Sequence, residues 1–139
     1  MADVTTATTV QNAATPISEA IVYASGSFAR TYTGSGSTNV FVFEANLATG
    51  AISNAWMKST ETTDFTDFNA TGGSGTISGS SYAITGNTGS YNSNTINHWE
   101  MNGSGLTVGG STGGSYQIGI SGNSNVENGT FSGNITALP

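Results

Sequence analysis

The sequence predicts an all-β protein, a single antiparallel β-sandwich or barrel of about eight short strands with an extended N-terminal arm. Three observations predict this fold. Apolar and polar residues alternate in many short runs between Ile21 and Leu138, which is typical of strands. Turn-forming residues separate the runs, and no segment keeps the period of a helix. The 139 residues are about the size of one domain, so we expect one core.

The first 18 residues differ from the rest of the chain, because they contain few large apolar groups and a proline without a backbone donor. We therefore expect residues 1–18 to be an arm and residues 19–139 to be the β domain. The first strand is expected over about residues 20–33. In it, Ile21 and Tyr23 share a face, and Gly26 suggests a bulge or bend.

The most regular hairpin is expected between Thr38 and Lys58, with its turn at residues 48–50. Side chains of a strand point alternately to its two faces. In the strand before the turn, one face is expected to point to the core and to carry Phe41, Phe43, Ala45 and Leu47. The opposite face of that strand carries Val40, Val42, Glu44 and Asn46. The return strand is expected to place Ile52, Asn54, Trp56 and Lys58 on one face, and Ala51, Ser53, Ala55 and Met57 on the other.

Shorter alternating runs predict the remaining strands. Gly79 and Ser80 suit a tight turn, because glycine accepts the positive φ of a primed turn. Asn128 and Gly129 predict another hairpin turn for the same reason. The apolar residues of the later strands are expected at Ile77, Tyr82, Ile84, Ile96, Trp99, Met101, Leu106, Val108, Tyr116, Ile118, Ile120, Phe131 and Ile135.

The composition is poor in charge. Charged residues make up 7% of the chain, against about 25% in a typical soluble domain, while Gly, Ser and Thr are abundant. Arg30 and Lys58 are the two basic residues, and the formal net charge is −6. Two separate bases cannot neutralise several phosphates, which argues against a nucleic-acid partner. No apolar run reaches the roughly 20 residues of a bilayer-spanning helix, so we expect no membrane insertion.

Catalytic groups are scarce. The chain has no cysteine, and its one histidine, His98, is expected to be half-buried and bonded to a backbone carbonyl. Residues 109–113 match the G-x-S-x-G form, but no helix is expected after the serine, as a hydrolase would need. We therefore expect a protein that is not an enzyme and holds no cofactor.

Two weaker site hypotheses remain open. Glu61, Asp64 and Asp67 form an acidic cluster that offers oxygen ligands to Ca²⁺, although the spacing matches no known calcium loop and favours a solvated loop. Aromatic rings with polar edges are suited to stacking against sugars, although core packing is the alternative. The candidate stacking residues are Trp56, Tyr91, Trp99 and Tyr116.

The runs "FVFEANLATGAISNAW" and "GSGTISGSSYAITG", within residues 40–86, combine a strand, an acidic or polar residue, a T-G turn and a short return strand. This pattern resembles surface β-barrel domains of the transferrin-binding protein B type. The resemblance implies a surface barrel that contacts another protein, and it assigns no functional residue.

These observations favour a non-enzymatic structural β-subunit of an extracellular, cell-surface or virion assembly. Its arm, with Val4, Val10 and Ile17, suits an added strand on the exposed sheet edge of a neighbouring copy. Such exchange would build a homo-oligomeric ring, filament or capsid. The alternative is a secreted surface module that binds a protein or glycan ligand.

Overall fold

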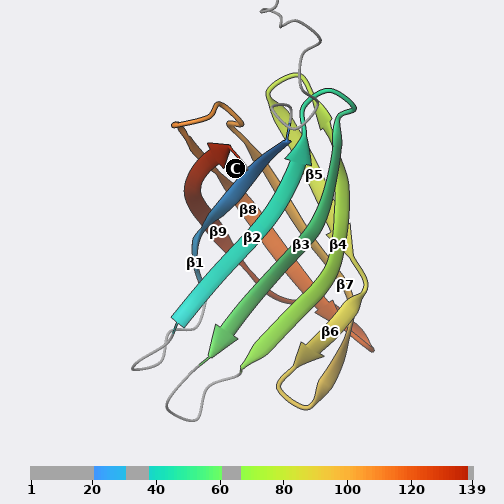
Figure 1. Ribbon diagram of the computed structural model, residues 1–139. Helices are drawn as coiled ribbons and strands as arrows, with labels where there is room; N and C mark the ends of the chain where they lie inside the picture. The colour runs from blue at the N-terminus through green and yellow to red at the C-terminus, as the bar shows by residue number, and fades with distance from the viewer. Residues whose placement is uncertain (1–20, 31–37, 61–66, 138–139) are drawn as a thin grey trace, which may run out of the picture.

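The computed structural model describes residues 21–30, 38–60 and 67–137, so the expected arm lies outside the described residues. The described chain consists of nine strands and contains no helix (Figure 1). The all-β prediction is confirmed. The strands are β1 (Ile21–Ala29), β2 (Thr38–Asn46), β3 (Ala51–Thr60), β4 (Phe68–Ser78), β5 (Ser81–Gly86), β6 (Thr88–Tyr91), β7 (Asn94–Ser104), β8 (Ser111–Ile120) and β9 (Asn123–Ala137).

The strands form a closed antiparallel barrel (Figure 1). Each strand pairs with a neighbour in sequence order, and β1 closes the barrel by pairing with β9. β5 and β6 share one position, because both pair with different parts of β4 and β7. Every described strand therefore has a hydrogen-bonded neighbour on both sides for part of its length, while residues 123–129 of β9 pair with β8 alone.

Apolar alternation places the core inside the barrel. Phe41 and Phe43 of β2 are fully buried, as predicted. The ring centroid of Phe41 lies 5.1 Å from that of Phe131, and the Phe43 centroid lies 5.1 Å from that of Tyr82. An eight-position barrel has an interior just wide enough for side chains. The interior is accordingly a packed, aromatic-rich core.

Trp99 needs glycine around it. Its fully buried ring lies so close to β4 and β5 that a Cβ added at Gly73 would lie 2.5 Å from the ring, and one at Gly86 would lie 2.2 Å from it. The indole nitrogen donates a hydrogen bond to the carbonyl of Thr71 at 3.0 Å. Two of the many glycines thus make room for the largest side chain of the core.

The β2–β3 hairpin has the predicted turn, and the core face of β2 is as predicted up to Ala45, but Leu47 and the faces of β3 differ from the prediction. Leu47 lies in the turn and is 44% exposed, so its assignment to the core was wrong. In β3, Asn54 has a positive φ of 54°, and the register shifts on both sides of the strand. This bulge interrupts the alternation, so that Ile52 and Ala55 are both buried while Trp56 points outward.

Three further local predictions were wrong. Asn128 and Gly129 lie inside β9, where the glycine is needed because a Cβ would lie 2.1 Å from the Ala29 carbonyl oxygen. Gly26 makes no bulge, since the pairing of β1 with both neighbours continues through it without a shift. Leu106 and Val108 belong to the connection between β7 and β8.

Candidate functional site

An ion pair lies inside the barrel, near the end where β1 and β3 finish. Arg30 follows β1, and its guanidinium contacts the Glu127 carboxylate of β9 through two hydrogen bonds, Nε to Oε2 at 2.8 Å and Nη2 to Oε1 at 2.7 Å. Both side chains are fully buried. The hydroxyls of Tyr91 and Tyr116 each donate a further bond of 2.7 Å to the same carboxylate. Glu127 thus accepts four hydrogen bonds.

Arg30 makes further contacts within the same buried group of side chains, which we call the inner cluster. Nη1 of Arg30 donates to Ser59 Oγ at 2.9 Å, and the Ser59 hydroxyl donates to Asn39 Oδ1 at 2.6 Å. Burial lowers the pKa of Arg30, but the bond and the charge of Glu127 outweigh it and leave that pKa above its ordinary value. The guanidinium also lies 4.9 Å from the ring centroid of Phe68.

Both tyrosines of the inner cluster stay protonated donors. Burial is the largest cause that raises the pKa of Tyr91 and of Tyr116, and the Glu127 carboxylate raises both further. Because the charged groups are paired with each other and closed off from solvent, the inner cluster presents no surface to a ligand. Its role is in the integrity of the barrel, since loss of either partner would leave an unpaired buried charge.

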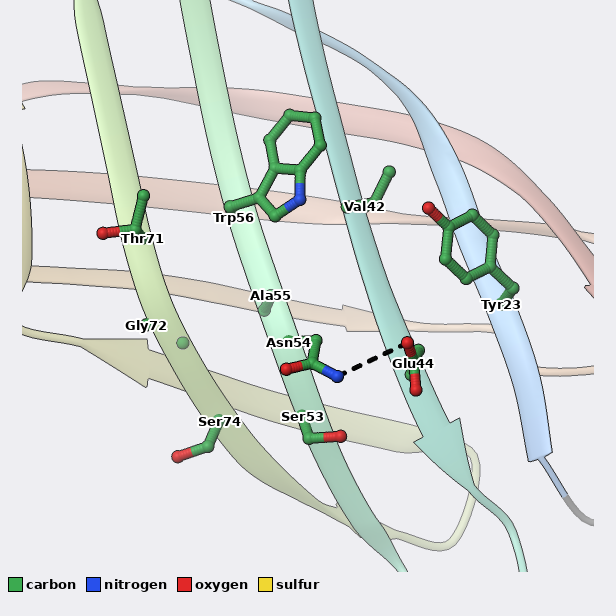
Figure 2. A pocket seen from close by; sticks show the side chains of 11 residues that line it. Tyr23, Val42, Glu44, Ser53, Asn54, Ala55, Trp56, Thr71, Gly72 and Ser74 are labelled. Atoms are coloured by element: carbon green, nitrogen blue, oxygen red, sulfur yellow. Dashed lines mark hydrogen bonds between the residues drawn. The ribbon is translucent and has the colours of Figure 1, made fainter.

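The outer face of the barrel carries an open groove of about 530 Å³ across β1, β2, β3 and β4. Figure 2 shows the Val42 side chain between Trp56 of β3 and Tyr23 of β1. The register explains this arrangement, since Val42 pairs with Trp56 and Tyr23 pairs with Glu44. Tyr23, Val42 and Trp56 are all partly exposed. We call this region the aromatic groove.

A polar pair lies beside the aromatic rings. The Asn54 amide nitrogen donates a hydrogen bond to Glu44 Oε2 at 3.4 Å (Figure 2). The β3 bulge produces this contact, because it turns Asn54 outward next to Ser53. Of the described residues that line the aromatic groove, Glu44 alone carries a carboxylate. The aromatic groove thus combines flat apolar rings with an acceptor and an amide.

A second hollow of about 310 Å³ lies beside the aromatic groove and shares Gly72 and Ser74 with it. We call it the histidine hollow, because His98 lines it together with Thr85 and Asn87. His98 was expected to be bonded to a backbone carbonyl. Its Nε2 instead lies 3.0 Å from Oε1 of Glu100, and the imidazole is exposed on the outer face of β7.

The structure separates the four candidate stacking residues. Trp56 lines the aromatic groove, but Tyr91, Trp99 and Tyr116 are buried inside the barrel, so the alternative of core packing holds for these three and the stacking hypothesis is wrong for them. Period-two alternation identifies residues that share a face but does not say which face is the core. Tyr91 and Tyr116 point inward to bond Glu127, and Trp99 fills the space over two glycines.

Other predicted site residues fall partly outside the described chain. Of the Ca²⁺ candidates, Glu61 and Asp64 lie outside the described residues, and Asp67 is exposed beside β4. Within the described ranges, no group of three acidic or histidine side chains is arranged to hold a metal ion. The assembly residues Val4, Val10 and Ile17 also lie outside these ranges, so their role stays a prediction.

Sequence reasoning missed Tyr23, Glu44 and Asn54 as site residues. The alternation within β2 predicts that Glu44 points away from the core. That Tyr23 and Asn54 lie beside it follows only from the strand register and the bulge. It also missed the Arg30–Glu127 pair, which is separated by 97 positions. The signal was weak, since one of two basic residues following an apolar strand is unremarkable in sequence.

Comparisons with models of known families, with curated proteins and with solved structures found no match to this chain. The resemblance to surface barrels of the transferrin-binding protein B type therefore stays a prediction. In the described part of the chain, no helix has the length and hydrophobicity required to span a bilayer.

Proposed function

We propose that this protein is a non-enzymatic surface module that binds a carbohydrate in the aromatic groove. The observation that carries the proposal is the grouping of two partly exposed aromatic rings, Tyr23 and Trp56, around an apolar floor with a carboxylate and an amide at one side. A binding module for a glycan accounts for each part of this grouping.

The chemistry of the lining suits a sugar. The C–H face of a sugar ring is apolar and packs on flat aromatic rings, whereas its edge carries hydroxyls. Glu44 accepts hydrogen bonds from hydroxyls, and Asn54 both donates and accepts them. The volume of about 530 Å³ is within the usual range for small-ligand sites, and all these side chains lie on paired strands that hold them in place.

The same lining supports binding without hydrolysis. Glycoside hydrolysis typically requires two carboxyl groups on either side of the scissile bond, about 5–10 Å apart. The described lining of the aromatic groove provides the carboxylate of Glu44 without a second one. An extracellular, cell-surface or virion location agrees with this proposal, because neutral glycans are common ligands there.

Replacing Trp56 by alanine is expected to weaken glycan binding at least tenfold, about 1.4 kcal/mol, because the larger stacking surface is lost. Isothermal titration calorimetry with a panel of neutral cello-, xylo- and malto-oligosaccharides measures this. Trp56→Phe should retain part of the affinity.

Lys58→Ala is the matched control, since Lys58 is exposed on the same strand but does not line the aromatic groove. Equal affinities for Trp56→Ala and the native protein would show that the ligand binds elsewhere. Equal losses from Trp56→Ala and Lys58→Ala would indicate a general effect on the barrel.

Self-association through residues 1–18 is the second candidate function. The observation in its favour concerns the end of the barrel where β1 begins. Leu47 lies at this end, because it follows Asn46, the partner of Ile21. Val108 lies there too, because the amide of the next residue, Gly109, donates a hydrogen bond to the carbonyl of Ile135 near the end of β9. Leu47 and Val108 are the exposed large hydrophobic residues of the described chain. Because the described strands are paired on both sides along most of their length, we expect the arm to dock at this end of a neighbouring barrel.

Deleting residues 2–18 is expected to reduce an oligomer to a folded monomer of about 12 kDa, because the deletion removes 17 residues from a chain of 14.0 kDa. Light scattering measures the mass, and circular dichroism checks that the barrel remains folded. Leu47→Ser in the full chain should weaken the same assembly. An assembly that keeps its full mass after the deletion would exclude the arm as the contact.

A further inference from the structure

We propose that the aromatic groove and the histidine hollow form one continuous site for a linear neutral glycan of several sugars, which crosses β4 at Gly72–Ser74. This inference rests on the proposed function and extends it from the kind of ligand to its length and path. Both hollows lie on the outer surface of the barrel, and they share Gly72 and Ser74 as lining residues.

Between the two hollows, β4 has little side chain to block a ligand. Gly72 is exposed and has a positive φ of 68°, and the nearest atoms to a Cβ added there would belong to the Thr88 side chain at 3.5 Å. Gly73 points inward toward Trp99. The outward surface here is therefore mainly backbone and a small serine hydroxyl, which leaves a shallow passage over the strand.

The length of this path requires more than one or two sugars. It runs from Tyr23 on β1 across β2, β3, β4 and β5 to His98 on β7. Neighbouring strands lie about 4.8 Å apart, so five steps measured around the convex outer surface span on the order of 20 Å. A ligand that fills both hollows is therefore a chain running across the strands.

The far end of the path offers hydrogen-bonding groups suited to sugar hydroxyls. Thr85, Asn87 and His98 line the histidine hollow with a hydroxyl, an amide and an imidazole. The imidazole is oriented by Glu100, whose other oxygen accepts a bond of 2.9 Å from Asn102. The aromatic groove therefore supplies stacking at one end, and the histidine hollow supplies polar contacts at the other.

Calorimetry on the full chain with matched oligosaccharides of two to six sugars tests the continuous site. The dissociation constant is expected to fall at least tenfold between the disaccharide and the hexasaccharide. His98→Ala should remove most of this gain in affinity while leaving disaccharide affinity unchanged. Asn87→Ala repeats the test at the connection between β5 and β6. Thr95→Ala, exposed on β7 outside the hollow, should have no effect.

The outcomes separate this inference from the proposed function. Trp56-dependent binding that is equally tight for two and six sugars, or a length gain that survives both His98→Ala and Asn87→Ala, would overturn the continuous site and leave the glycan proposal standing. If no glycan binds and an uncharged peptide binds in a Trp56-dependent way, both are wrong and the groove is a protein-binding surface.

Discussion

Replacing Glu127 by alanine is expected to destabilise the barrel by about 3–5 kcal/mol, because the buried guanidinium of Arg30 then loses its paired charge. The hydroxyls of Tyr91 and Tyr116 also lose their shared acceptor. Chemical denaturation followed by circular dichroism measures the loss. Glu127→Gln keeps the side-chain volume and should also destabilise, since it removes the charge but retains an acceptor.

Glu100→Ala is the control for this prediction, because the carboxylate of Glu100 is partly exposed and its pairing with His98 lies at the surface. Its effect should stay within about 1 kcal/mol. Adding Arg30→Met to Glu127→Ala should recover part of the stability by removing the unpaired charge. A loss from Glu127→Ala no larger than that from Glu100→Ala would contradict the role given to the inner cluster.

Replacing Phe43 by alanine is expected to cost about 3–5 kcal/mol, the usual range for truncating a fully buried phenylalanine. The substitution removes ring contacts to Tyr82 and Phe41 and leaves a cavity in a barrel whose paired strands limit collapse. Thermal and urea unfolding of the purified variant measure the loss.

Leu47→Ala provides the matched comparison. Both residues were assigned to the same face of one strand, but Leu47 is exposed in the turn after β2. Its truncation should change stability by no more than about 0.5 kcal/mol. Similar losses for the two variants would contradict the position of the core in this hairpin.

The fold class was predictable because β2 and its neighbours repeat one simple pattern. Phe41 and Phe43 alternate with partly exposed residues, and buried side chains of a barrel strand must do so. Closure was not predictable in the same way, since β1 and β9 lie at opposite ends of the described chain. The sequence left sandwich and barrel open, and the β1–β9 pairing decides for the barrel.

Local interruptions limited the prediction of the site. The bulge at Asn54 changes which side chains face outward after it, and no glycine or proline marks it in the sequence. Trp56 and Trp99 both lie in alternating runs, yet one is partly exposed and the other is buried against Gly73 and Gly86. The aromatic groove depends on the register of several strands, which residue patterns within single strands do not contain.

Amide chemical-shift mapping tests directly whether the outer face of β1–β4 binds a neutral glycan. A ¹⁵N-labelled sample is titrated with the neutral hexasaccharide that binds most tightly in calorimetry. We expect shift changes concentrated around Tyr23, Glu44 and Trp56, with smaller changes near His98 and none on the outer face of β8. Changes centred on β8 and β9, or no saturable change with any of the glycans, would contradict this expectation.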